Sequence, residues 1–399
     1  MKNKKVAIFV SQYSVGISSS ILNLIKFLSE GYHVDLYLSN VSLTNTTVIA
    51  TTNIRIIQIN RIFPLRGLFG RLKNNQIEFS LRGLFGRLKN NQIEYEFSIC
   101  FDPHGFVLCR EILPHSKPFY YSLELYTKKD HYGLYYPTKV MEYERNEINT
   151  ISGLIIQSEE KDKIFRIDYS LSDDIPTFIL PVTYTGPPVK QKGIFVHEKL
   201  KIPLNKKVAL HLGGISWWFS CIEISAIFST VDDWVLVFQG YPNKKYLKKF
   251  KTHLLKNNIQ NVYILDEVYD SIEEVDPIIQ SCSLGIAWYN DISIGFRTAG
   301  KSSGKIPAYL RFGLPVIAKK YKSTIESIES TGCGLCVEHV DEIRKALEQI
   351  NKNYTYYSNN ALCEYKKTYL FENYSKGLLN FLLSNTSISE SSQAGGRNQ

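Results

Sequence analysis

Apolar residues first cluster near the start of the chain, where positions 6–10 form an uninterrupted run. A short, continuous apolar run is typical of a strand that is buried on both faces. Over 21–28 the apolar residues instead recur every three or four positions, as they do along a helix, and Gly31 ends this segment. A second apolar run follows at 34–38. The pattern predicts a strand, a turn, a helix and a strand, which together begin a parallel sheet.

The same alternation of strands and helices continues in two series. In the first series, we expect helical character around 140–149 and strands at 97–101, 119–123, 153–157 and 177–180. In the second series, we expect strands at 208–212, 234–238, 262–265, 284–288 and 315–318, the last of which closes the set. Short apolar strands that alternate with helical stretches indicate doubly wound sheets.

A segment rich in glycine, proline and lysine at 185–193 separates the two series, and we place the domain boundary there. The expected fold is α/β, with two Rossmann-like, doubly wound domains that face each other across a cleft. A helix is expected over about 363–383. The predicted parts are an N-terminal domain at 1–185, a C-terminal domain at 186–365, a helix at 366–385 that packs back toward the N-terminal domain, and a disordered tail at 386–399.

The composition narrows the protein class without selecting a ligand. The chain of 399 residues is 44% hydrophobic with a net charge of +9, which suits a folded protein that binds nucleotides, phosphorylated substrates or an anionic membrane surface. Seven scattered cysteines indicate reduced thiols, although Cys333 and Cys336 would also suit a redox or metal pair. The start lacks a signal-peptide pattern, and no run approaches the roughly 18 apolar residues of a membrane span. We expect a cytoplasmic protein, or one at the inner face of the membrane.

Parallel sheets bind ligands at the carboxyl ends of their strands, so two facing sheets should bind a ligand between them. Four loops are expected to meet in this cleft: 13–18, 101–105, Gly213-Gly214 and 295–305. The last loop contains Ser302-Ser303-Gly304-Lys305 just before a short helix predicted at 306–310. Backbone amides at a helix start, a glycine that permits close approach and a lysine suit an anion such as a diphosphate. An ordinary solvated lysine at a capped helix is the alternative.

Several segments resemble one enzyme family. Residues 305–317, with Glu326 and 332–338 after them, are similar to the donor-binding segment of the GT-B glycosyltransferases, particularly their retaining family-four branch. Members of that branch carry a serine- and lysine-containing turn, a glutamate-tyrosine helix and the pattern G-x-P-V-I. Residues 121–125 and 142–159 resemble the same enzymes, so the resemblance spans most of the chain. It also places Cys333 and Cys336 where the family has small or aliphatic residues around a turn.

The resemblance implies that the second domain holds a nucleotide-sugar donor. Gly213 and Gly214 would pass close to the diphosphate, and Lys305 with the amides of Ser302, Ser303 and Gly304 would stabilise the leaving diphosphate. The backbone of Asp266, Glu267 and Val268 would meet the base.

In the first domain, the resemblance implies that Gly16 lets the diphosphate and acceptor approach. His104 would lie near the donor sugar, unless it merely satisfies a loop carbonyl. Glu124 is either an acceptor-side carboxylate or a half-buried hydrogen-bonding residue.

The sequence also departs from the family pattern at three positions. The glutamate that holds the ribose is replaced by Ala308, and its partner glutamate eight residues earlier by Gly300. The arginine or lysine after the first strand of the donor domain has become Trp217-Trp218. These changes admit an inactive relative, although Arg297 would supply a substitute positive charge.

The segment at 65–78 is repeated letter for letter at 81–94. Its apolar residues follow helical spacing and its arginines lie elsewhere, so each copy predicts a basic amphipathic helix that suits an anionic bilayer. A tandem duplication that packs on the sheet is the alternative. Because a shift of sixteen residues rotates a helix by roughly 160°, either the chain bends near 79–80 or one copy faces inward and the other outward. We favour the second arrangement.

The sequence therefore predicts a glycosyltransferase of the hexosyltransferase type. It would move a sugar from a UDP- or GDP-type donor to a hydroxyl of a glycan or lipid-linked glycan, without metal or other cofactor, in cell-surface polysaccharide or glycoconjugate synthesis. Retention of configuration is implied by the resemblance. The alternatives are a non-catalytic GT-B-like binding subunit and a nucleotide-sugar epimerase on the same fold. A nucleic-acid partner is not expected, because 38 acidic residues dilute the positive charge.

Overall fold

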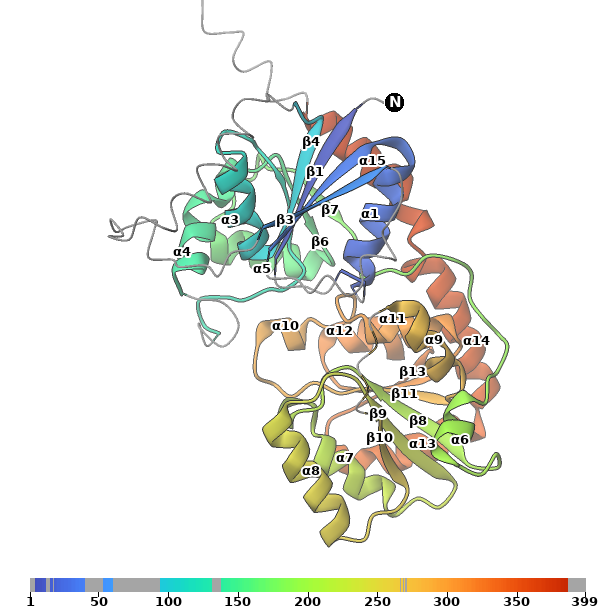
Figure 1. The fold of residues 1–399 in the computed structure, drawn as a ribbon. Coiled ribbons are helices and arrows are strands. Elements are labelled where there is room, and N and C mark those ends of the chain that lie inside the picture. The colour runs from blue at the N-terminus through green and yellow to red at the C-terminus, as the bar shows by residue number, and fades with distance from the viewer. Residues whose placement is uncertain are drawn as a thin grey trace, which may run out of the picture.

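The chain folds into two lobes, each built around one parallel sheet (Figure 1). The computed structural model describes residues 4–11, 15–16, 18–39, 53–59, 94–130, 138–265, 267, 269 and 271–386. The doubled segment at 65–94, with the exception of Glu94, lies outside these residues. So does the predicted tail at 386–399, with the exception of Thr386. None of the helices in the described part is both long and apolar enough to cross a bilayer.

The first sheet has seven parallel strands in the order β3-β2-β1-β4-β5-β6-β7. Its strands are β1 (Lys5–Ser11), β2 (His33–Ser39), β3 (Ile54–Ile59), β4 (Phe97–Phe101), β5 (Phe119–Tyr121), β6 (Gly153–Ile156) and β7 (Thr177–Ile179). The helices around it include α1 (Ser19–Gly31), α3 (Asp102–Ile112), α4 (Thr138–Glu147) and α5 (Glu159–Tyr169). The central strands are apolar on both faces because helices cover both sides of the sheet.

The second sheet has six parallel strands in the order β10-β9-β8-β11-β12-β13. Its strands are β8 (Lys207–Leu212), β9 (Trp234–Gln239), β10 (Val262–Leu265), β11 (Leu284–Ala287), β12 (Val316–Lys319) and β13 (Gly334–Val337). Its helices include α6 (Phe195–Leu200), α7 (Cys221–Phe228), α8 (Lys244–Lys256), α9 (Ile272–Gln280), α10 (Ile294–Arg297), α11 (Lys305–Arg311), α12 (Lys322–Thr324), α13 (Ile343–Lys352) and α14 (Tyr354–Glu364). The predicted fold class, two doubly wound α/β domains, is confirmed.

Strand order reverses direction at β1 in the first sheet and at β8 in the second. In each sheet the chain first builds outward on one side of this strand and then crosses to the other side. Such reversal points leave a crevice at the carboxyl ends of the strands, where parallel sheets bind ligands. Both crevices open toward the space between the lobes.

The chain returns to the first lobe at its C-terminal end (Figure 1). Helix α15 (Glu372–Thr386) packs on the first sheet, where the ring of Phe381 lies 5.5 Å from those of Phe119 and Phe178. The returning segment is hydrogen-bonded to the outgoing connection, because the Tyr184 amide donates to the Tyr369 carbonyl at 2.9 Å. The Phe371 amide donates in turn to the Tyr184 carbonyl at 2.9 Å. The two crossings therefore form one short ribbon.

Three sequence predictions need correction. The predicted helix at 363–383 is interrupted, because Leu370 adopts an extended conformation to pair with the outgoing chain. The segment 101–105 is not a loop but the end of β4 and the start of α3, where Pro103 occupies the first turn, a position that proline tolerates. The strand at 315–318 does not close the set, since β13 pairs with β12.

Candidate functional site

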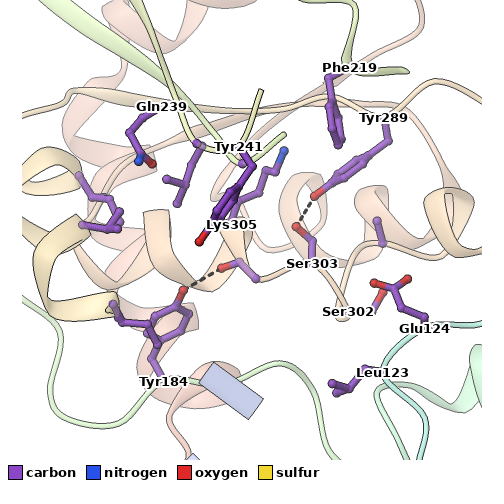
Figure 2. Close-up of a pocket in the computed structure, with 18 of the residues that line it drawn as sticks. Leu123, Glu124, Tyr184, Phe219, Gln239, Tyr241, Tyr289, Ser302, Ser303 and Lys305 are labelled. Carbon is purple, nitrogen blue, oxygen red and sulfur yellow. Dashed lines mark hydrogen bonds between the residues drawn. The ribbon is translucent and has the colours of Figure 1, made fainter. Parts of the chain in front are cut away.

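A cavity of about 390 Å³ lies between the two lobes, a size typical of small-molecule sites. The first lobe contributes Leu123, Glu124 and Lys161 to its wall. The second lobe contributes the ends of β8 and β9, one face of α9 and the loop that leads into α11. Of the predicted site residues, the cavity brings together Glu124, Gly213, Ser302, Ser303, Gly304 and Lys305 (Figure 2).

Lys305 is the first residue of α11, and its side chain is only 9% exposed. Its ammonium has no hydrogen-bond partner among the residues that the structure describes. Nζ instead lies 4.5 Å from the centre of the Phe219 ring and 4.7 Å from that of Tyr289. Burial lowers the pKa of Lys305 to about 7. A buried amine without a hydrogen-bonding acceptor is costly, so the site favours a ligand that brings a negative charge.

Two glycines let the strand ends approach closely above this lysine. Gly213 has φ +113° and Gly240 has φ +140°, both in the region that favours glycine. A Cβ added to Gly240 would lie 2.1 Å from the Gly213 carbonyl oxygen, so no side chain fits there. A Cβ added to Gly213 would lie 3.6 Å from Nζ of Lys305. The backbone at Gly213 is therefore open to close approach by a ligand next to the lysine.

Hydroxyl groups fix the loop that precedes α11. The hydroxyls of Ser303 and Tyr289 are hydrogen-bonded to each other (Figure 2). Ser302 Oγ donates to the Thr298 carbonyl at 3.1 Å. Tyr184, on the connection between the lobes, donates to the Gly304 carbonyl at 3.3 Å. The loop is thus held from within its own lobe and from the connection.

Glu124 faces this loop from the first lobe, on the opposite side of the cavity (Figure 2). Asp102 holds its segment, because one carboxylate oxygen accepts from the amides of Leu123 at 2.7 Å and Glu124 at 3.2 Å. The Glu124 side chain still reaches solvent, but the cavity walls desolvate it and raise its pKa, which the nearby Lys161 partly counteracts. Lys161 is buried and donates to Gln157 Oε1 at 2.9 Å. Glu124 therefore suits a hydrogen bond from a ligand hydroxyl.

Other predicted site residues do not line the cavity. His104 is buried in α3, and burial lowers its pKa to about 4, so it is neutral at physiological pH. Arg297 is paired with Asp291, and Glu267 with Lys199. Gly16 lies in a turn and Gly214 follows β8, and neither lines the cavity. Asp266 and Val268 lie outside the described residues.

Sequence reasoning missed the aromatic and polar residues that shape the cavity. Phe219 and Tyr289 cover Lys305, and Gln239 and Tyr241 end the wall at β9 (Figure 2). Their positions at or shortly after the ends of β8, β9 and β11 (Leu284–Ala287) are the only local signal for them, and aromatic residues are also frequent in cores. Tyr184, within the predicted N-terminal domain, was not singled out.

The departures from the family pattern have structural counterparts. A Cβ at Gly300 would lie 2.1 Å from the Ser323 carbonyl oxygen, so a side chain cannot replace this glycine without movement of α12. Ala308 is 1% exposed and packs inside the second core. Trp217, which replaces the arginine or lysine of the family pattern, is 56% exposed and carries no charge.

The two cysteines of the Cys333–Cys336 pair have free thiols, and burial raises the pKa of each to about 12. Such thiols are poor nucleophiles and poor metal ligands at neutral pH. Cys336 lies in β13, so the pair begins a strand.

One family model matches the sequence. Residues 250–368 match the Glucosyltransferase 3-like, C-terminal domain. These residues contain the α11 segment and Lys305. No curated protein matches the chain significantly.

Solved structures match over almost the whole chain. HepE from Anabaena, in complex with UDP and glucose, shares 14% identity and covers 96% of this chain and 100% of its own, with a TM-score of 0.71. Sucrose-phosphate synthase from Thermosynechococcus elongatus shares 10% identity over 98% of this chain and 100% of its own, with a TM-score of 0.68. A glycosyltransferase from Rickettsia africae shares 10% identity over 96% and 98%, with a TM-score of 0.66. The chain therefore has the two-domain GT-B fold, as the sequence resemblance implied.

Proposed function

We propose that the protein is a glycosyltransferase that takes a sugar from a nucleoside diphosphate donor. The observation that carries this proposal is the unpaired ammonium of Lys305, buried beside an open glycine backbone in a cavity between two Rossmann-like sheets. Its position in the segment that matches the Glucosyltransferase 3-like domain supports the same conclusion. HepE, which has a similar fold, binds UDP and UDP-glucose. A uridine donor is the first to test.

In this proposal the diphosphate lies against Gly213 and the amides of the 302–304 loop. Lys305 leaves the rings of Phe219 and Tyr289 and pairs with the phosphate oxygens. The positive charge then stabilises the negative charge that develops on the leaving diphosphate. The same ammonium supplies the neutralisation that a divalent cation would otherwise provide.

The acceptor approaches from the first lobe. Glu124 accepts a hydrogen bond from the attacking hydroxyl, and the desolvation that raises its pKa makes it a stronger acceptor for that proton. The acceptor is a hydroxyl of a glycan or lipid-linked glycan in cell-surface polysaccharide or glycoconjugate synthesis, and transfer proceeds with retention.

Isothermal titration calorimetry with UDP, GDP and CDP tests the donor site. We expect one nucleotide to bind with a micromolar dissociation constant and Lys305→Met to weaken binding at least tenfold. Lys322→Met is the matched control, because the Lys322 side chain is 74% exposed. If no nucleotide binds, or if both variants bind alike, the donor site is wrong.

A non-catalytic binding subunit is the second candidate, because neither Gly300 nor Ala308 offers a polar side chain to the donor. It predicts nucleotide or glycan binding without turnover. Incubation with UDP-glucose and analysis of the products separates the possibilities: released UDP with transferred or free glucose supports the transferase. An intact donor supports the binding subunit, and an epimerised UDP-sugar supports an epimerase.

A further inference from the structure

Helix α8 concentrates positive charge on the outside of the second lobe. Its thirteen residues contain six lysines and no carboxylate. At about 100° per residue, all six lie within an arc of about 160°, and Phe250 lies on the opposite side. Phe250 is fully buried, which fixes the helix with its lysine face toward solvent. The exposed lysines are Lys244, Lys245, Lys248, Lys249, Lys251 and Lys256.

Little in the described part of the chain neutralises this charge. Apart from Lys251, the lysines of α8 form no ion pair with a described residue. Glu223, on the neighbouring helix α7, is exposed but pairs with none of them. Like charges three and four residues apart destabilise a helix. The face is therefore arranged for an anionic partner more than for the stability of the isolated lobe.

An apolar residue lies within the same arc. Leu255 is 82% exposed, which is unusual for a leucine on a charged face. A groove beside it is lined by apolar and polar residues together: Lys251, Leu254, Leu255, Asn258, Ile259, Gln260 and Val262. This face thus offers cations around an apolar point of contact.

We propose that the lysine face of α8 docks on an anionic lipid bilayer. A bilayer supplies phosphates for the lysines and, just beneath them, hydrocarbon for Leu255. A soluble polyanion would satisfy only the lysines. Helix α8 lies on the outer side of the second lobe, away from the first lobe (Figure 1), so docking leaves the cavity between the lobes accessible.

Vesicle co-sedimentation tests this surface. The wild-type chain should bind vesicles of phosphatidylglycerol and phosphatidylcholine, and not vesicles of phosphatidylcholine alone. At about 1 kcal/mol per lysine near an anionic surface, removal of three lysines weakens binding about 100-fold. We expect at least this loss for Lys245→Glu/Lys248→Glu/Lys249→Glu. The matched control is Lys345→Glu/Lys352→Glu/Lys366→Glu, which changes net charge equally at exposed positions on other helices. It should keep most of the binding.

Leu255→Ser identifies the kind of partner. It should weaken vesicle binding about fivefold and leave the weak binding of soluble polyglutamate unchanged. Thermal unfolding of each variant checks the fold. If both triple lysine variants lose vesicle binding equally, the effect is one of overall charge and the proposal is overturned. The proposal is also overturned if the α8 variant binds vesicles as well as the wild type does. Binding lost only when one copy of the doubled segment is deleted would assign the membrane contact there instead.

Discussion

If Lys305 holds the diphosphate as proposed, nucleotide binding is sensitive to pH. Burial against Phe219 and Tyr289 lowers the pKa of this amine to about 7, so it changes charge near neutrality in the unliganded protein. A diphosphate favours the charged form and therefore raises the pKa again in the complex. Affinity should accordingly fall as pH rises through 7.

The size of the effect follows from the protonated fraction. With a free-state pKa of about 7, half of the amine is charged at pH 7 and about 3% at pH 8.5. If the complex holds the proton throughout, the dissociation constant for UDP rises about 15-fold over this range. A terminal phosphate loses its last proton near pH 6 and is ionised throughout this range.

Calorimetry at pH 7, 7.5, 8 and 8.5 measures this slope. Titration at pH 7.5 in buffers with different ionisation enthalpies should show uptake of a fraction of one proton. Lys305→Met should bind more weakly, with a flat pH profile and no proton uptake. A wild-type profile as flat as that of the variant would refute the link between burial of this amine and binding.

The other predictions concern the glycines, a buried acid and the acceptor side. Gly240→Ala should destabilise the fold by about 4 kcal/mol in urea unfolding, because the added Cβ would meet the Gly213 carbonyl and the backbone there is strained for alanine. Gly31→Ala is the control, because a Cβ added there would have no atom within 4 Å. It should change stability by less than about 0.5 kcal/mol. Similar losses in both would contradict the steric argument. Burial raises the pKa of Glu144 to about 8, so stability should fall as pH rises from about 4.5 to 8, by about 3 kcal/mol at pH 7. Glu144→Gln should abolish that fall, and an unchanged pH slope would rule the carboxyl out. Glu124→Gln should lower kcat about 100-fold with UDP affinity unchanged, whereas an equal loss of UDP affinity would place Glu124 on the donor side.

The fold was largely predictable from sequence because buried parallel strands leave uninterrupted apolar runs. The run at 234–238 differs from β9 (Trp234–Gln239) by one residue. Strand β3 was missed because Arg55 and Gln58 interrupt its isoleucines at the edge of the sheet. Strand β13 was missed because Cys336 within it and Cys333 just before it drew a chemical interpretation.

The site was predictable only where backbone chemistry leaves a local signal. Gly213 and Lys305 were found because a glycine after a strand and a lysine at a helix start have recognisable contexts. Their mutual approach, and the rings that cover the lysine, depend on elements about 90 residues apart in sequence. The loop expected at 101–105 was wrong because a proline followed by a histidine and a glycine resembles a turn, whereas Pro103 here occupies the first turn of α3.

The ribbon at Tyr184 and Leu370 determines how the lobes can move. Two separate tethers would permit twisting, but these crossings are hydrogen-bonded to each other. A swing of the lobes about the ribbon would keep its hydrogen bonds, but it would have to separate Lys26 from Glu273 and Ile294 from Asp130, which join the lobes elsewhere. Tyr184 also donates a hydrogen bond to the Gly304 carbonyl, so such a swing would shift the 302–304 loop together with the mouth of the cavity. The same motion would therefore change both access to the cavity and the affinity of the cavity for an anion.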